Sequence, residues 1–224
     1  MVGRLSDSDH DKVSAAIASA EAGTSGEILA VTAEQSDPYH DVGLHYAIAA
    51  LFLVLAVFAV KPEWLGWWWD RLMGWSMPPA LGELLTLLLG IALLKFLAIL
   101  FIMKWMPLRL ALTPGPTKTR RVRRRAIILF KTAAERRTAG RTGILIYLSM
   151  AERRAEIIGD EAITAHTDPD TWAQAMAVML TEVRSGRPAE GVCAAIEHVG
   201  RILAADFPRS AKDKNEIPDK LIEL

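Results

Sequence analysis

Three carboxylates in this sequence stand where they could bind a divalent cation. Asp160 and Glu161 follow the end of one predicted strand, and Glu27 stands at the start of another. Carboxylate oxygens at strand ends are ligands that suit Ca²⁺ or Mg²⁺. The same residues could instead be solvated loop carboxylates or a helix cap. Both interpretations, a cation site and a structural role, are open at this stage.

The sequence contains no familiar catalytic motif. It lacks a glycine-rich phosphate loop, Cys/His metal-site spacing and a G-x-S-x-G element, and its five histidines are scattered. The single cysteine, Cys193, stands in an apolar helical pattern, which predicts a buried and unreactive thiol. This favours a non-catalytic protein and leaves enzymatic activity uncertain.

Two long apolar stretches have the length of membrane-spanning helices. They run over residues 44–60 and about 84–106, close to the roughly 20 residues that cross about 30 Å of hydrocarbon. Lipid offers no partner for backbone N–H and C=O groups, so each must be helical. The sequence therefore predicts a transmembrane hairpin over residues 44–106.

Tryptophan is concentrated in the predicted loop over residues 61–83. Indole rings favour the headgroup level of a bilayer, so an interfacial belt is predicted, with an aromatic ligand site as the alternative. The residues concerned are Trp64, Trp67, Trp68, Trp69 and Trp75.

Lys95 places a charge inside the second predicted span. Such a residue is costly at membrane depth and is a functional candidate. Two interpretations are open. The first is structural, with Lys95 reaching the interface or packing against a partner span. The second is a transport role, which would require oligomerised hairpins.

A basic cluster follows the second span. Residues 109–125 carry seven basic side chains and no acidic one, which favours contact with anionic lipid headgroups over nucleic-acid binding. Residues 24–43 carry no Lys or Arg and the loop carries two, so the positive-inside rule places the flank after the second span in the cytoplasm. The predicted lipid contacts are Arg120, Arg121, Arg123, Arg124 and Arg125.

The segments outside the hairpin predict one α/β domain. A strand over residues 26–32 needs partners, and a two-stranded hairpin over residues 143–158 is too small alone. Joined, they give a sheet of three or more strands covered by helices, built from residues 1–43 and 107–224. Both parts must then lie on one side of the membrane, which agrees with two spans. The N-terminal residues have no signal-peptide pattern, so an inner-membrane protein with the domain and both termini in the cytoplasm is expected.

Four stretches of the chain resemble the TPM domain. They are Thr24-Ser25-Gly26-Glu27-Ile28, Arg141 to Ile146, Ala151 to Asp160, and Asp213 to Leu221. The family includes thylakoid-lumen, photosystem II repair and receptor-auxiliary proteins, and the closer resemblance is to its bacterial predicted membrane proteins with an inserted hairpin. Where many members carry Asp-Asn-Gly before the central strand, this chain has Arg141-Thr142-Gly143.

The resemblance implies a small α/β domain attached to membranes that binds or assists other membrane proteins. Some members are described as acid phosphatases or bind divalent metal, so a metal-dependent phosphatase is the alternative. A small transport component built from oligomerised hairpins is a further alternative. The expected partners are membrane lipids and another membrane protein, without nucleic acid.

Overall fold

A computed structural model describes residues 5–74, 78–133, 142–167, 169–210 and 215–224. The chain forms two compact units, which are described separately. The α/β unit comprises residues 1–37 and 115–224, and the helical unit comprises residues 38–114. The boundaries predicted from hydropathy, 44 and 106, therefore fall a few residues inside the helical unit.

The α/β unit contains a four-stranded mixed sheet with the order β3-β2-β1-β4. Strands β1 (Glu27–Ala33) and β2 (Gly143–Ser149) are parallel, in a register that begins with Glu27 opposite Gly143. Strand β3 (Arg154–Gly159) returns antiparallel beside β2. These pairings confirm the α/β fold class and the joining of the two sequence segments into one sheet.

Strand β4 (Ile222–Glu223) was not predicted. It pairs in parallel with β1, opposite Val31 and Thr32. Two residues are too few to give a period-two hydropathy signal, so only the tertiary contact reveals this strand. The C-terminal segment docks on the unit through Ile217 and Leu221, whose side chains are both buried.

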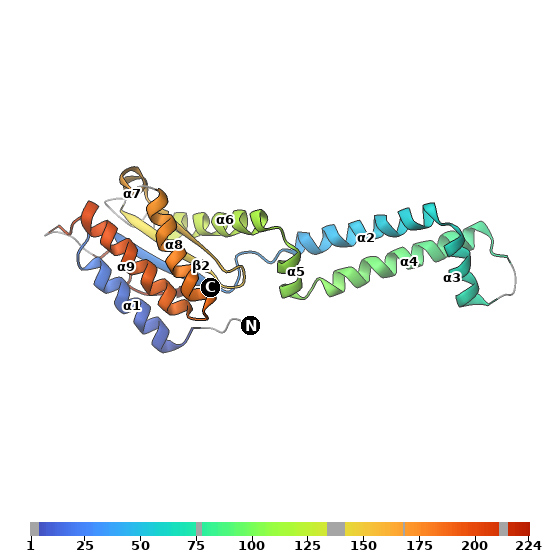
Figure 1. Cartoon of the computed structure of the whole chain (residues 1–224), viewed down its shortest axis with the longest axis horizontal. Coiled ribbons are helices and arrows are strands. Elements are labelled where there is room, and N and C mark those ends of the chain that lie inside the picture. The colour runs from blue at the N-terminus through green and yellow to red at the C-terminus, as the bar shows by residue number, and fades with distance from the viewer. Residues whose placement is uncertain (1–4, 75–77, 134–141, 168, 211–214) are drawn as a thin grey trace. The chain divides into compact units, whose positions relative to one another are not determined.

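Helices cover both faces of this sheet (Figure 1). Helices α1 (Asp7–Glu21), α8 (Pro169–Arg184) and α9 (Pro188–Asp206) pack on the face that carries Ile28 and Ile146. Helix α6 (Gly115–Ala133) packs on the opposite face, and α7 (Glu161–His166) follows β3. All seven residues of β1 and of β2 are buried, as expected for strands enclosed on both faces. The apolar spacing of the sequence predicts a helix over residues 117–139. The structure describes this helix as far as Ala133, and residues 134–139 lie outside the described residues.

The helical unit is a hairpin of two long helices with two short ones. Helix α2 (His40–Val60) and helix α4 (Leu81–Ile102) run side by side (Figure 1). A side chain at Gly43, near the start of α2, would place its Cβ 3.1 Å from Cβ of Met103, just after α4. Helix α3 (Glu63–Met73) lies within the segment predicted as a loop, and α5 (Met106–Leu112) follows α4 after a turn. The connection predicted over residues 61–83 thus contains a short helix, and the second long helix ends at Ile102, before residue 106.

Candidate functional site

The apolar side chains of the hairpin are mostly uncovered within the unit. Only 17 % of the most apolar window of α2 is buried, and only 6 % of that of α4. Phe52, Leu53, Leu89, Leu94 and Phe101 are each more than 60 % exposed. A core helix of a soluble protein would bury such residues, since apolar surface in water costs about 25 cal/mol per Å². Both helices are long and apolar enough to cross a membrane.

The short helix α3 presents tryptophans at the turn of the hairpin. Trp64, Trp67 and Trp68 are 52 %, 59 % and 42 % exposed, and the rings of Trp67 and Trp68 meet edge to face with centroids 5.3 Å apart. Trp69 is half-buried, and Trp75 lies outside the described residues. Exposed indoles beside the ends of apolar helices suit the headgroup level.

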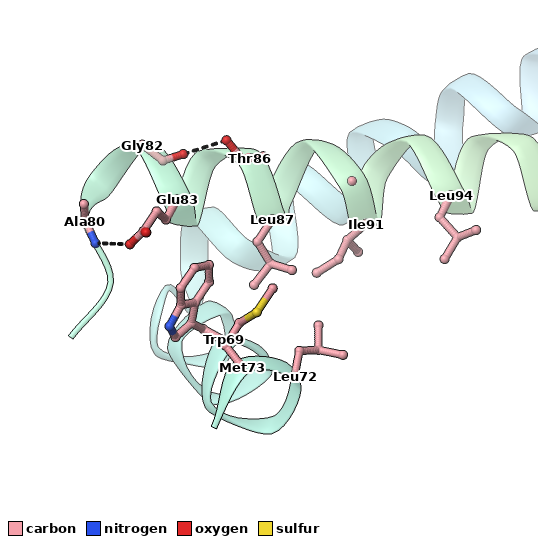
Figure 2. Close-up of a pocket in the computed structure, with 11 residues that line it drawn as sticks. Trp69, Leu72, Met73, Ala80, Gly82, Glu83, Thr86, Leu87, Ile91 and Leu94 are labelled. Atoms are coloured by element: carbon pink, nitrogen blue, oxygen red, sulfur yellow. Dashed lines mark hydrogen bonds between the residues drawn. The ribbon is translucent and has the colours of Figure 1, made fainter. Parts of the chain in front are cut away.

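An apolar groove of about 730 Å³ lies between α3 and α4. In Figure 2, Trp69 and Met73 of α3 lie opposite Leu87 of α4. The carboxylate of Glu83 and the hydroxyl of Thr86 are hydrogen-bonded within the helix start: Glu83 Oε2 accepts the Ala80 N–H at 2.8 Å, and Thr86 Oγ1 donates to the Gly82 carbonyl at 2.8 Å. The groove therefore offers apolar contact, and it gives no support to a polar aromatic ligand site.

A buried arginine closes the base of the hairpin. Arg109 of α5 is 7 % exposed, and its Nε donates to the carbonyl of Met103 at 2.7 Å. Its Nη1 donates to the carbonyl of Pro38 and lies 3.4 Å from Nδ1 of His40. One guanidinium thus ties the entry of α2 to the exit of α4. The sequence indicated only a basic residue here, because the partners are backbone carbonyls far apart in the chain.

The predicted lipid-contacting arginines divide into two groups on α6. Arg120, Arg123, Arg124 and Arg125 are exposed. Arg121 is half-buried, and its Nη1 donates to Asp37 Oδ1 at 2.7 Å. Helix α6 packs its apolar stripe on the sheet, so the arginines between the stripe positions face outward. The first group remains available to anionic lipid, whereas Arg121 ties α6 to the segment after β1.

Two of the three predicted cation ligands, Asp160 and Glu27, hold backbone N–H groups at one end of the sheet. Asp160 is 5 % exposed, and its Oδ2 accepts the Gly143 N–H at 3.1 Å. Glu27 is 5 % exposed, and its Oε2 accepts the Ile217 N–H at 3.1 Å. Glu161 begins α7 and is exposed. Among the described residues, no group of three or more His, Cys, Asp or Glu side chains is placed to hold a metal ion. The cation site stays a prediction.

Sequence reasoning missed a polar cavity at the start of β1. The cavity, of about 100 Å³, is lined by Glu21, Glu27, Arg209, Asn215 and Asp219 among others. Glu21, at the end of α1, is 9 % exposed and its Oε1 accepts the Ile28 N–H at 2.6 Å. Its partners come from residues near both ends of the chain, so no local spacing could have revealed the cluster.

Burial dominates the electrostatics of this cavity. Burial raises the pKa of Glu21 to about 8, and the neighbouring carboxyls of Glu27 and Asp219 act in the same direction. The hydrogen bond from the Ile28 N–H acts in the opposite direction and lowers the pKa of Glu21. Glu21 is therefore protonated at neutral pH and can donate a hydrogen bond to Asp219.

Cys193 and Lys95, the two other residues discussed from the sequence, lie in different units. Cys193 was predicted to be buried, but it is half-buried. Its partial burial raises the pKa of the thiol, which disfavours the reactive thiolate. Lys95 of α4 is exposed on the hairpin. The structure thus does not gather the predicted residues into one site: the carboxylates hold the end of the sheet, the arginines lie on α6, and Lys95 belongs to the other unit.

No protein-family model and no curated protein sequence matches this chain. Among solved structures, the chain is similar to the NMR structure of the BA42 protein from the psychrophilic bacterium Bizionia argentinensis. The TM-score is 0.56 at 17 % sequence identity, over 99 % of this chain and 97 % of that one. At this identity the likeness concerns the fold alone, and it supports the TPM-like fold that the sequence indicates.

Proposed function

We propose that this chain is an integral membrane protein whose helical hairpin tethers a TPM-like α/β domain to the bilayer. The observation that carries this proposal is the exposed apolar surface of α2 and α4. The hairpin is inserted between β1 and α6 of a domain whose own core is complete without it. The α/β unit buries its apolar side chains in its own core, whereas those of α2 and α4 would be buried by a bilayer.

The charge distribution supports a cytoplasmic domain. The exposed arginines of α6 follow the hairpin directly, and the segment between α2 and α4 contains only Lys61 and Arg71 as basic residues. By the positive-inside rule, α6 belongs on the cytoplasmic side of an inner membrane. Both halves of the α/β domain then lie there too, and the tryptophans of α3 occupy the opposite interface.

The domain's role in this proposal is to bind or assist another membrane protein rather than to catalyse a reaction. The support is the TPM-like fold together with the structural use of the candidate carboxylates Asp160 and Glu27. No specific observation favours the phosphatase alternative, because the described residues contain no group of three or more His, Cys, Asp or Glu side chains placed to hold a metal ion.

Reporter fusions and carbonate extraction test this proposal. Alkaline phosphatase fused between α3 and α4 should be active, and the same reporter after Leu224 should be inactive. The membrane fraction should retain the full chain at alkaline pH. Release by carbonate would overturn membrane insertion, and an active C-terminal fusion would overturn the orientation.

Purification in mild detergent tests the assisting role. The full chain should recover the same membrane protein in independent preparations. The absence of any reproducible partner would contradict this role while leaving the tether unaffected.

A further inference from the structure

Lys95 lies well inside helix α4, away from both helix ends. It lies 14 residues after Leu81 and seven before Ile102, the two ends of the helix. At 1.5 Å per residue, it is about 10 Å inside the nearer end. Side chains on a helix lean toward its N-terminus, which for Lys95 is the farther end. Reaching the nearer interface would therefore require the side chain to fold back against its own helical direction.

The hairpin itself supplies no counter-charge. Residues 44–60 and 84–103 contain no Asp or Glu. The nearest acidic residue of α4, Glu83, is 12 positions earlier, about 18 Å along the axis, and caps the helix start. Asp41 lies beyond the level of Gly43, where an added Cβ would lie 3.1 Å from Cβ of Met103. Among the described residues, no carboxylate is paired with Lys95.

The surface around Lys95 has the form of a helix-packing face. Ile91, Lys95, Ala98 and Ile102 recur at spacings of four, three and four, which places them on one side of α4. Lys95, Ala98 and Ile102 are exposed, and Ile91 is half-buried. The small side chain of Ala98 lets a second helix approach closely. We call these four residues the Lys95 face.

We propose that the Lys95 face docks a transmembrane helix of another protein that carries a carboxylate about 10 Å inside the membrane. Charge complementarity selects this occupant. A second copy of this chain would bring Lys95 against a surface without acidic residues, or against another lysine. The inference rests on the proposed membrane insertion and names the chemistry of the partner.

The test uses the full chain in phosphatidylcholine vesicles with synthetic poly-leucine transmembrane peptides. One peptide carries a single Asp at matching depth, and two controls carry Asn or Leu there. Each has a photoreactive group one turn away, and the crosslinking yield is measured at pH 7.5. We expect about tenfold more crosslinking to the Asp peptide than to the Leu peptide, mapped to α4.

Two variants distinguish the effect of the Lys95 ammonium group on crosslinking from the effect of helix packing alone. Lys95→Leu should reduce crosslinking of the Asp peptide to the level of the Leu peptide, and Lys95→Arg should keep it. Lys104→Leu is the matched control, since Lys104 follows α4 and lies beside Phe101; it should leave the yield unchanged. Equal yields for all peptides, as expected if Lys95 reaches lipid headgroups, would overturn the inference.

Carbonate extraction of the same vesicles distinguishes this failure from that of the proposed function. If the chain is inserted but does not discriminate between the peptides, the Lys95 inference alone is wrong. If the chain is released, membrane insertion is wrong and the docking of a transmembrane helix falls with it.

Discussion

The central sheet and helix α4 are both near-continuous apolar runs, yet they use their apolar side chains in opposite ways. Strands β1 and β2 bury all seven of their residues between helices. Helix α4 leaves Leu89, Leu94 and Phe101 more than two-thirds exposed. Composition therefore does not decide burial within the chain. The difference is the source of the apolar surroundings, which the fold supplies for the sheet and a bilayer would supply for the hairpin.

The polar groups of the two units differ in the same sense. In the α/β unit, carboxylates at the sheet end accept backbone N–H groups, as Glu21, Glu27 and Asp160 do. In the helical unit, the buried side chain of Arg109 at the hairpin base donates to a backbone carbonyl. The middle of the hairpin offers no such partner for Lys95 among the described residues. The ammonium group of Lys95 is therefore not paired with a described residue of the helical unit, which is the basis for proposing an external partner.

A matched pair of leucine substitutions gives the largest expected contrast. Leu203→Ala in α9 removes a side chain that is 0 % exposed and should destabilise the α/β unit by about 2–5 kcal/mol. Leu89→Ala in α4, 68 % exposed, should leave that stability unchanged. Amide hydrogen exchange of β1 and β2 in detergent measures both. A large effect of Leu89→Ala would show that the hairpin contributes to the domain core.

The Glu21 cavity predicts a pH dependence of a definite sign. The pKa of Glu21 in the folded state, about 8, is above its ordinary value of 4.5, so the folded state binds the proton more tightly than the unfolded state. The contribution of protonated Glu21 to the free energy of unfolding is complete below pH 4.5 and is lost as the pH rises toward 8. The loss is about 1.4 kcal/mol per pH unit, or roughly 3–5 kcal/mol in total.

Replacement by glutamine checks this dependence. Glu21→Gln cannot ionise, so the difference in unfolding free energy between the variant and the wild type should vary with pH over this interval. Denaturant titrations at pH 5, 6, 7 and 8 measure it. A difference that is constant with pH would contradict the proposed protonation of Glu21.

Charges placed on the hairpin distinguish a bilayer from water as its solvent. Leu89→Arg should reduce membrane insertion by about 2.5–3.5 kcal/mol, because the side chain lies near the middle of α4. Leu81→Arg, at the first residue of α4, is the matched control and should cost much less. The glycosylation-based insertion assay reports both. Equal insertion of the two variants would indicate that α4 does not span the membrane.

The two kinds of arginine on α6 give the smallest expected effects. Arg124→Gln should weaken binding to anionic vesicles by about 1 kcal/mol without changing domain stability. Arg121→Gln should instead lower stability slightly, since it removes the ion pair with Asp37. Vesicle sedimentation and thermal unfolding separate the two. The reverse pattern would mean that Arg121 rather than Arg124 contacts lipid.

The sequence alone determined the features that depend on local pattern. The apolar lengths of residues 44–60 and 84–106 predicted α2 and α4, because hydropathy over about 20 residues needs no tertiary information. The strands at Glu27 and Gly143 followed from short apolar runs. Their union in one sheet followed from the requirement that a lone strand and a lone hairpin find partners.

Only the tertiary structure decided which polar residues act together. It paired the predicted ligand Asp160 with Gly143, placed Asp219 beside Glu21, and gave Arg109 the carbonyls of Met103 and Pro38. Most of these contacts join positions distant in sequence, and a hydrogen bond depends on position in space rather than on spacing along the chain. Tertiary structure likewise showed that Lys95 stands exposed without an acidic partner among the described residues, because a lone cation's surroundings cannot be read from its neighbours in sequence.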